Sequence, residues 1–285
     1  MTQPIQDIEA IAPLHPVVAN PWVALRRFTD ARIALGRAGV SLPTQAHLQF
    51  QQAHAQARDA VHQALDVPQL AQQLSAAWLP RAPQPLGLHS AAANRAQYLQ
   101  RPDWGRLLDA ESRSHLQALR EADHSGLPRP FDLVLVVADG LSALAVQQNA
   151  PPFLEALRHT LAVTHWRIAP LCIVEQGRVA VGDAVGEALG ARAVVVLIGE
   201  RPGLSSPDSM GLYLTWMPRV GLTDAARNCI SNVRPAGLSY SAAAAKLAYL
   251  LEQARSRQLS GVDLKDDTAP TAIVGGQAQN NFLLD

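Results

Sequence analysis

Two apolar runs constrain the fold of this chain more than any other feature. FDLVLVVA extends from Phe131 to Ala138, and ARAVVVLIG extends from Ala191 to Gly199. Runs of this kind are typical of strands buried on both faces. FLEALRHTL and VGDAVGEALG have helical spacing between them, and LCIVEQG and LYLTWMP supply further candidate strands. Strands that alternate with helices predict an α/β, Rossmann-like domain with a largely parallel sheet and flanking helices.

Composition divides the rest of the chain into regions. Four prolines in the first 22 residues limit regular structure, so we expect a flexible arm over 1–22. An α-helical N-terminal region and connector is expected over 23–125, with the connector beginning near residue 80. The α/β domain is expected over 126–265, with its last helix from Ser241 to Leu259, and a flexible tail over 266–285.

Two helices are expected in the N-terminal region. WVALRRFTDARIALG, from Trp22 to Gly36, is helical in composition. A second helix begins at Thr44, because apolar residues then recur at spacings of four and three until Pro68: Ala46, Phe50, Ala53, Ala57, Ala60 and Ala64. Small residues along such a seam allow a close helix contact, either within this chain or with another chain.

Charge and hydropathy exclude several classes of function. Lys and Arg number 24, as do Asp and Glu, so the chain has no net charge to attract nucleic acid or an anionic membrane. The apolar runs are far shorter than the ~20 residues that cross a bilayer. Two cysteines, Cys172 and Cys229, cannot form a disulfide framework, so we expect an intracellular protein.

Several catalytic motifs are absent from the sequence. It contains no G-x-G dinucleotide fingerprint, no phosphate-binding P-loop and no G-x-S-x-G elbow. No two histidines have the i, i+4 spacing of a helical metal site. An ordinary NAD-dependent or ATP-dependent enzyme is therefore disfavoured, and no metal site is expected.

Polar groups follow the expected strands, at the edge where open α/β sheets bind ligands. Asp139 either accepts hydrogen bonds from a ligand or caps the following helix. Glu200, flanked by glycines, is either a polar anchor for a ligand or the partner of an arginine such as Arg201 or Arg219.

A third polar loop is expected over residues 228–232. Its Cys229 has no histidine near it in the sequence to activate it as a nucleophile. We therefore favour a role for Cys229 in the wall of a pocket.

The chain also resembles a known family in several collinear blocks. These are GRVAVGDAVGEALGARAVVVLIGERPGLSS, RNCISNVRPAG and LSGVDL, together with ARIALGRAG, QAHAQARDAVH and HSAAANRAQYLQRPDWGRLL upstream. Over residues 24–265 they resemble the small subunit of ethanolamine ammonia-lyase. The resemblance implies an adenosylcobalamin-dependent enzyme that converts ethanolamine to acetaldehyde and ammonia by a radical mechanism.

The same resemblance implies how the work is shared between subunits. A large TIM-barrel subunit binds the substrate, and the small subunit helps to enclose the cobalamin at their interface, within a hetero-oligomer of several such pairs. Family contacts to the cofactor fall on Val179, Glu200 and Cys229, and no catalytic residue falls on this chain. Such enzymes reside in a bacterial microcompartment or in the cytoplasm.

The positions of the histidines indicate whether this chain could supply the axial ligand of the cobalt. Some cobalamin proteins supply a histidine from D-x-H-x-x-G, but no histidine here has an aspartate two positions before it. We therefore expect the cofactor to bind base-on, with its own benzimidazole retained. The alternative from another class of function is a non-catalytic binding module on the same scaffold, with a nucleotide-like ligand.

Overall fold

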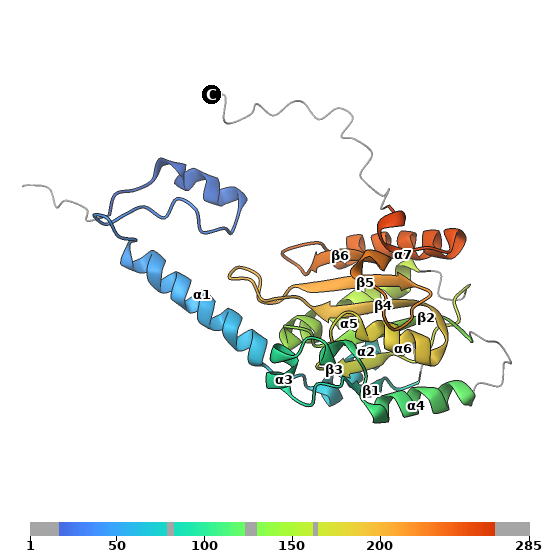
Figure 1. Cartoon of the computed structure of the whole chain (residues 1–285). Helices are drawn as coiled ribbons and strands as arrows, with labels where there is room; N and C mark the ends of the chain where they lie inside the picture. The colour runs from blue at the N-terminus through green and yellow to red at the C-terminus, as the bar shows by residue number, and fades with distance from the viewer. Residues whose placement is uncertain (1–16, 79–82, 123–129, 162–164, 266–285) are drawn as a thin grey trace, which may run out of the picture. The chain divides into compact units, whose positions relative to one another are not determined.

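A computed structural model describes residues 17–78, 83–122, 130–161 and 165–265. Residues 1–16 of the expected arm and the expected tail over 266–285 lie outside the described residues. The chain divides into two compact units (Figure 1). The smaller unit reaches to Arg58 and includes Gly203–Ser205, and the larger one comprises Asp59–Pro202 and the chain from Ser206 onward.

The larger unit contains a six-stranded sheet in the order β1-β3-β2-β4-β5-β6 (Figure 1). Its strands are β1 (Leu86–His89), β2 (Phe131–Ala138), β3 (Cys172–Glu175), β4 (Ala191–Gly199), β5 (Met210–Trp216) and β6 (Arg227–Val233). The pairs β1–β3, β3–β2 and β2–β4 are parallel, whereas β4–β5 and β5–β6 are antiparallel. The α/β class is confirmed, but the sheet is mixed rather than largely parallel.

The lengths of the connections explain the mixed sheet. A parallel pair needs a crossover of a dozen or more residues, usually a helix. Helix α5 (Ala143–Thr160) connects β2 to β3, and α6 (Val181–Leu189) connects β3 to β4. Only residues 200–209 connect β4 to β5. Because this connection is too short for a crossover, β5 returns antiparallel to β4.

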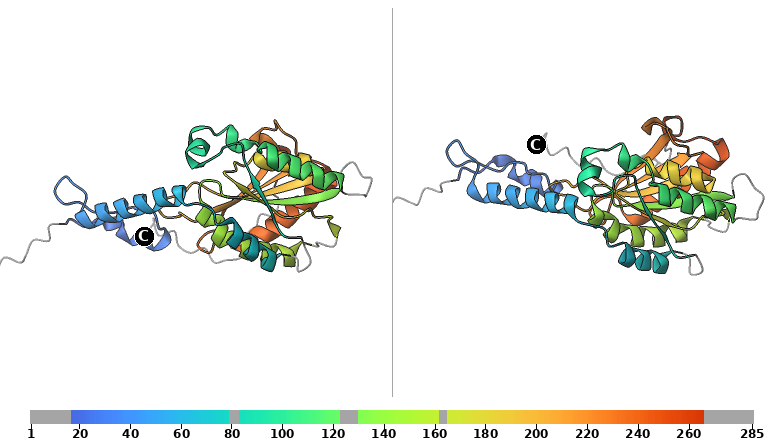
Figure 2. Two further views of the ribbon diagram at one scale, coloured as in Figure 1. Left: turned by 90° about the horizontal axis from the view of Figure 1, so that it is seen from below. Right: turned by 60° about the horizontal axis from the view of Figure 1, so that its bottom comes forward.

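Helices cover both faces of the sheet (Figure 2). Helices α2 (Val67–Ala77), α5 and α7 (Tyr240–Arg257) pack on one face, and α4 (Ala110–Glu121) and α6 pack on the other. Alternate residues of β2 enter opposite core layers, Leu135 on the first face and Val136 on the second. Both faces of this strand are therefore buried, which explains its continuous apolar sequence.

Residues 80–125 contribute more to the sheet than the expected connector would. They supply β1 at one edge and α4 on the second face, with the short helix α3 (Arg95–Gln100) between them. Residues 228–232, expected as a loop, lie within β6 instead. Ile230 and Val233 enter the first core layer, while Cys229 and Ser231 are exposed, as expected for an edge strand with one buried face.

The chain after α7 returns to β6. The side chain of Asn228 donates to the carbonyl oxygens of Gly261 and Leu264, at 3.1 and 2.8 Å, and accepts from the backbone N–H of Gly261 at 2.7 Å. The 3-10 helix η5 (Gly261–Asp263) is thereby attached to β6.

The smaller unit contains the 3-10 helix η1 (Pro21–Phe28) and most of α1 (Thr44–His62). The helix expected from Trp22 to Gly36 is wrong beyond Phe28, because Thr29 is extended with φ −157° and ψ 143°. The Arg26 guanidinium then donates to the carbonyl oxygens of Ile33 and Ala34, at 2.8 and 3.1 Å, so a side chain satisfies groups that a helix would pair internally.

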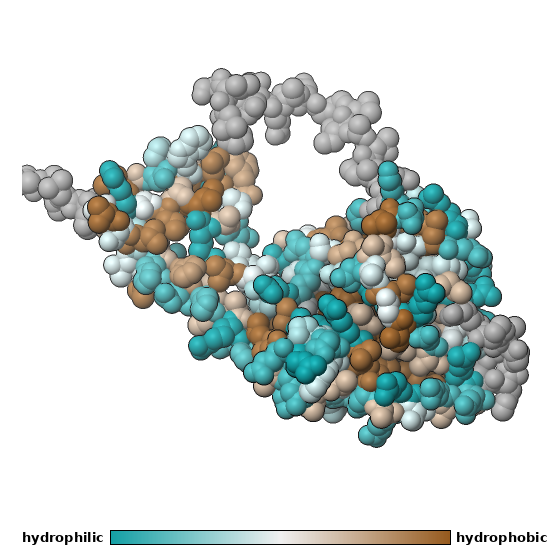
Figure 3. Space-filling model, viewed as in Figure 1, coloured by the Kyte–Doolittle hydropathy of each residue, from teal (hydrophilic) through white to brown (hydrophobic). Residues whose placement is uncertain are grey.

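Large apolar side chains lie exposed on the smaller unit (Figure 3). Helix η1 contains no buried residue. The exposed side chains belong to Val17, Val18, Trp22, Val23, Phe28, Val40, Leu42, Leu48, Phe50 and Leu204. Of the alanine seam on α1, Ala53 and Ala60 are buried, whereas Phe50 is 39% exposed. Among the described helices, none is long and apolar enough to cross a membrane.

Candidate functional site

The candidate site lies on the second face of the sheet, over β5 and β6, which follow β4 toward one edge of the sheet. Helix α7 packs against β5 and β6 on the first face. On the opposite face, Tyr213 is paired in register with Val196 of β4 and with Cys229 of β6. Tyr213 is half-buried, while Cys229 and Ser231 are exposed. This part of the sheet therefore presents side chains that a ligand could contact.

Glu200 lies over the same face, directly after β4. The Ser209 hydroxyl donates to its Oε2, and the backbone N–H of Asn232 donates to the same oxygen at 3.3 Å. A Cβ placed on Gly211 would lie 2.9 Å from the other oxygen, Oε1. The carboxylate is therefore held by Ser209 and Asn232, rather than by the arginines considered from the sequence.

Cys229 and Tyr213 are register partners on β6 and β5, so their side chains lie next to each other on the same face of the sheet. Burial raises the pKa of the Cys229 thiol, while the Tyr213 hydroxyl lowers it and Glu200 raises it further. The net shift is upward from 9.0, so the thiol is protonated at neutral pH. A protonated thiol is a poor nucleophile, which disfavours nucleophilic catalysis by Cys229. Its place in the wall of a pocket stays a prediction.

Val179 lies in the segment between β3 and α6. Its side chain and that of Tyr213 both pack against the second core layer. The structure thus brings Glu200 and Cys229 together around Tyr213, and places Val179 against the same layer. It assigns Val179 no polar side-chain contact, because valine has none to make.

Sequence reasoning missed Tyr213 and Ser209. The alternation in LYLTW carried a signal for Tyr213, since it places Leu212 and Leu214 on one face of a strand and Tyr213 on the other. Ser209 lay in a turn-like segment with no periodic signal. Its partner Glu200 is nine residues earlier, and only the fold shows the contact.

A cavity of about 460 Å³ adjoins the segment that carries Val179. Its walls include Ala180, Asp183, Arg227 and residues 220–224. Asp183 and Arg227 form a buried ion pair at 2.8 Å, and their side chains are only 3% and 2% exposed. Burial raises the pKa of Asp183 to about 6, and Arg227 opposes that rise. Because Arg227 begins β6, this ion pair fixes the strand that carries Cys229 to the start of α6.

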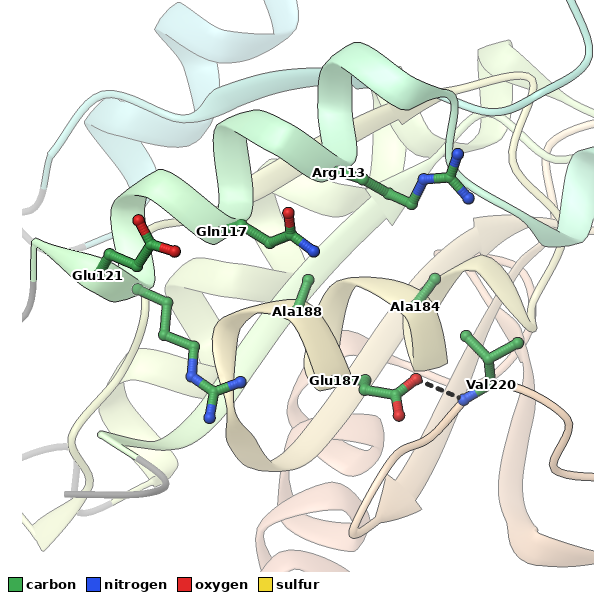
Figure 4. A pocket seen from close by; sticks show the side chains of 8 residues that line it. Arg113, Gln117, Glu121, Ala184, Glu187, Ala188 and Val220 are labelled. Carbon is green, nitrogen blue, oxygen red and sulfur yellow. Dashed lines mark hydrogen bonds between the residues drawn. The ribbon is translucent and has the colours of Figure 1, made fainter.

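A second, more open groove of about 800 Å³ lies between α4 and α6 (Figure 4). Arg113 and Gln117 of α4 face Ala184 and Ala188 of α6 across it. Its lining includes none of Val179, Glu200 and Cys229.

Asp139 does not cap the following helix, which was one of the two roles considered for it from the sequence. Ser142, rather than Asp139, caps α5 by accepting from the backbone N–H of Ala145 at 3.2 Å. Asp139 is buried, accepts from the backbone N–H of Gly177 at 3.0 Å and lies 3.6 Å from Arg95. Its carboxylate joins the ends of β2 and β3 within the protein, which gives it a structural contact in place of a helix cap.

Asp139→Asn is expected to change how stability depends on pH. Burial raises the pKa of Asp139 from 3.8 to about 6, against the attraction of Arg95. Above about pH 4 the folded state keeps a proton on Asp139 that the unfolded state has released. The neutral, protonated carboxyl favours the folded state at low pH, and this contribution to stability is lost as the pH rises through about 6. Asparagine has no such proton. The free energy of unfolding of the variant, minus that of the wild type, should therefore increase by roughly 2–3 kcal/mol from pH 4 to pH 7. Urea unfolding of the full-length chain across this range measures the difference, and parallel pH profiles would contradict it.

The chain is similar to known proteins over most of its length. Residues 19–265 match the family model described as ethanolamine ammonia-lyase light chain. The ethanolamine ammonia-lyase small subunit of Ralstonia nicotianae is 59% identical over 270 residues, which cover 94% of this chain and 96% of that protein. The small subunit of the same name from Azotobacter vinelandii is 58% identical over 270 residues, covering 94% and 97%.

Proposed function

Because this chain belongs to the ethanolamine ammonia-lyase light chain family, we propose that it joins a large subunit in an adenosylcobalamin-dependent enzyme that converts ethanolamine to acetaldehyde and ammonia. Val179, Glu200 and Cys229 contact the cofactor in this proposal, and the large TIM-barrel subunit binds ethanolamine. The observation that carries it is the cluster of Glu200, Tyr213 and Cys229 on a face of the sheet where Cys229 remains exposed.

The residues present fit a cobalamin. Its corrin ring is surrounded by amide side arms, which need hydrogen-bond acceptors and space. Glu200 offers Oε1 as an acceptor, Gly211 leaves space beside it, and Cys229 is exposed on the adjoining strand. When bound, adenosylcobalamin supplies the radical chemistry of the reaction. This chain then contributes binding, orientation and exclusion of water, which require no acid or base from it.

Two further features belong to the proposal. The cofactor is bound base-on, since no D-x-H-x-x-G histidine is present to replace its benzimidazole. The exposed apolar side chains of the smaller unit support contact with another protein, because apolar surface gathered in one region is typical of protein interfaces. We propose that the partner there is the large subunit, in a hetero-oligomer within a bacterial microcompartment or the cytoplasm.

The test is reconstitution from separate subunits. The purified chain, the large subunit and their mixture are each supplied with ethanolamine and adenosylcobalamin, and acetaldehyde is measured. We expect product only from the mixture. Turnover by this chain alone, or an inactive mixture with a large subunit shown to be competent with another small subunit, would overturn the proposal.

Glu200→Gln tests the cofactor contact. We expect the KM for adenosylcobalamin in the reconstituted enzyme to rise about 10-fold, because a neutral amide accepts hydrogen bonds less strongly than a carboxylate. The urea midpoint of the variant provides the control. A lower midpoint with an unchanged cofactor KM would assign Glu200 a structural role instead.

A further inference from the structure

We propose that Ser209 and Gly211 are positioning residues for the cofactor, acting through Glu200: Ser209 holds one carboxylate oxygen, and Gly211 leaves space beside the other. The inference rests on the proposed cofactor contact of Glu200. It extends that contact to Ser209, which directly precedes β5, and to Gly211, which lies in β5.

Ser209 is bound to Glu200 at two points. Its hydroxyl donates to Oε2 of Glu200, and its carbonyl oxygen accepts from the backbone N–H of Glu200 at 2.9 Å. Ser209 is only 5% exposed, so solvent competes little for this hydroxyl. The backbone and the side chain of Glu200 are therefore both fixed by the first residue before β5.

The two carboxylate oxygens are used differently. Oε2 accepts from Ser209 and from the backbone N–H of Asn232. Within the part of the chain that the structure describes, these donors leave Oε1 available as an acceptor. A glutamate side chain loses rotamer freedom when it binds a ligand, which weakens binding. Because Ser209 and Asn232 already hold Oε2, that loss is incurred on folding and Oε1 is oriented before the cofactor arrives.

Gly211 lies in β5. Glycine inside a strand weakens it, and it often marks a position where another group lies close to the backbone. A Cβ at this position would lie 2.9 Å from Oε1 of Glu200 and 3.1 Å from Cε2 of Tyr213. Its φ is not positive, so the backbone conformation does not require glycine. Space for the carboxylate beside Tyr213 is the remaining reason for glycine here.

The test uses the reconstituted complex with the large subunit and adenosylcobalamin as the probe. Ser209→Ala is expected to raise the cofactor KM about 5- to 10-fold with kcat changed by less than about 2-fold, and Ser209→Thr, which keeps a hydroxyl, to restore most of the loss. Ser114→Ala removes an exposed hydroxyl that donates to the Ala110 carbonyl oxygen within α4, and it serves as the matched control with an unchanged KM.

A double-variant cycle separates positioning from a structural role. If Ser209 acts through Glu200, adding Ser209→Ala to Glu200→Gln leaves the cofactor KM within about 2-fold of Glu200→Gln alone. Equal effects of Ser209→Ala in both backgrounds would overturn the proposal for Ser209 and leave the role of Glu200 intact. An unchanged KM in Glu200→Gln alone would overturn the cofactor contact itself, and the positioning proposal with it.

Gly211→Ala gives an independent readout. Alanine suits a strand at least as well as glycine, so the urea midpoint should stay the same or rise. The cofactor KM should nevertheless rise about 5-fold or more, because the methyl group displaces Oε1. A normal KM in a stable Gly211→Ala complex would overturn the proposal for Gly211. If Ser209→Ala does not fold, this variant still tests the orientation of Glu200.

Discussion

Arg227→Met is expected to lower the free energy of unfolding of the chain by about 3–5 kcal/mol. The guanidinium binds both carboxylate oxygens of Asp183, at 2.8 and 3.0 Å, and it also donates to the Leu222 carbonyl oxygen at 3.1 Å. Methionine fills much of the same volume but leaves the buried Asp183 carboxyl without its partner, so that this group must either remain charged or take up a proton. Urea unfolding of the full-length chain, compared by midpoint and slope, measures the loss.

Two controls identify the unpaired carboxyl group of Asp183 as the cause. Arg192→Met removes an exposed arginine 3.7 Å from Asp132, and its cost should stay below about 1 kcal/mol. Adding Asp183→Leu to Arg227→Met removes the stranded carboxylate and should recover part of the lost stability. A double variant no more stable than Arg227→Met would show that packing, rather than charge, causes the loss.

Gly199→Ala is expected to destabilise the chain by about 3 kcal/mol or more. A Cβ at this position would lie 2.0 Å from the Ser142 carbonyl oxygen and 2.6 Å from that of Asp139. Both contacts are to backbone, and the Gly199 carbonyl oxygen itself accepts from the backbone N–H of Leu141 at 2.9 Å. The end of β4 therefore cannot move away from the loop that follows β2 without losing the hydrogen bond between Gly199 and Leu141. Thermal unfolding of the full-length chain measures the effect.

Gly87→Ala provides the matched control for this prediction. It also adds one methyl group to a strand glycine, but the nearest heavy atom would be 4.0 Å away, on Val67. We expect its stability to stay within about 0.5 kcal/mol of the wild type or to rise slightly. Similar losses at both positions would indicate that the strand backbone, rather than the close approach at Gly199, causes the effect.

The sequence predicted the α/β class well because its signals are local. The runs Phe131–Ala138 and Ala191–Gly199 form β2 and β4, and the expected last helix coincides with α7 to within two residues at each end. Strand direction is not a local property. LYLTWMP predicts a strand at β5 whether its neighbour is parallel or antiparallel, and only the ten-residue connection from β4 excludes a helical crossover.

The helix expected from Trp22 to Gly36 shows a different limit. Its composition suits a helix, but the Arg26 side chain competes for the carbonyl oxygens of Ile33 and Ala34 after the chain turns at Thr29. The exposed apolar residues of this unit give it little core of its own. Helical propensity without a face to bury is weak support for a helix.

The candidate site was predictable in part. Glu200 directly follows an expected strand and is flanked by glycines, and this position was enough to select it. Cys229 was selected for the wrong local reason, since it lies in an edge strand rather than a loop. The link between the two positions depends on Tyr213, which reads as an ordinary strand residue until the register between β5 and β6 is known.

The attachment of Asn228 to Gly261 and Leu264 separates the two faces of β6 by what occupies them. Asn228 is in register with Leu214, whose side chain belongs to the first core layer, and Leu264 is buried in the same layer. The segment Gly261–Leu264 therefore closes the first face at the outer strand, whereas Cys229 lies on the opposite face. A protein shortened to end before Ser260 would lose this cover from the first face and keep the face that carries Cys229.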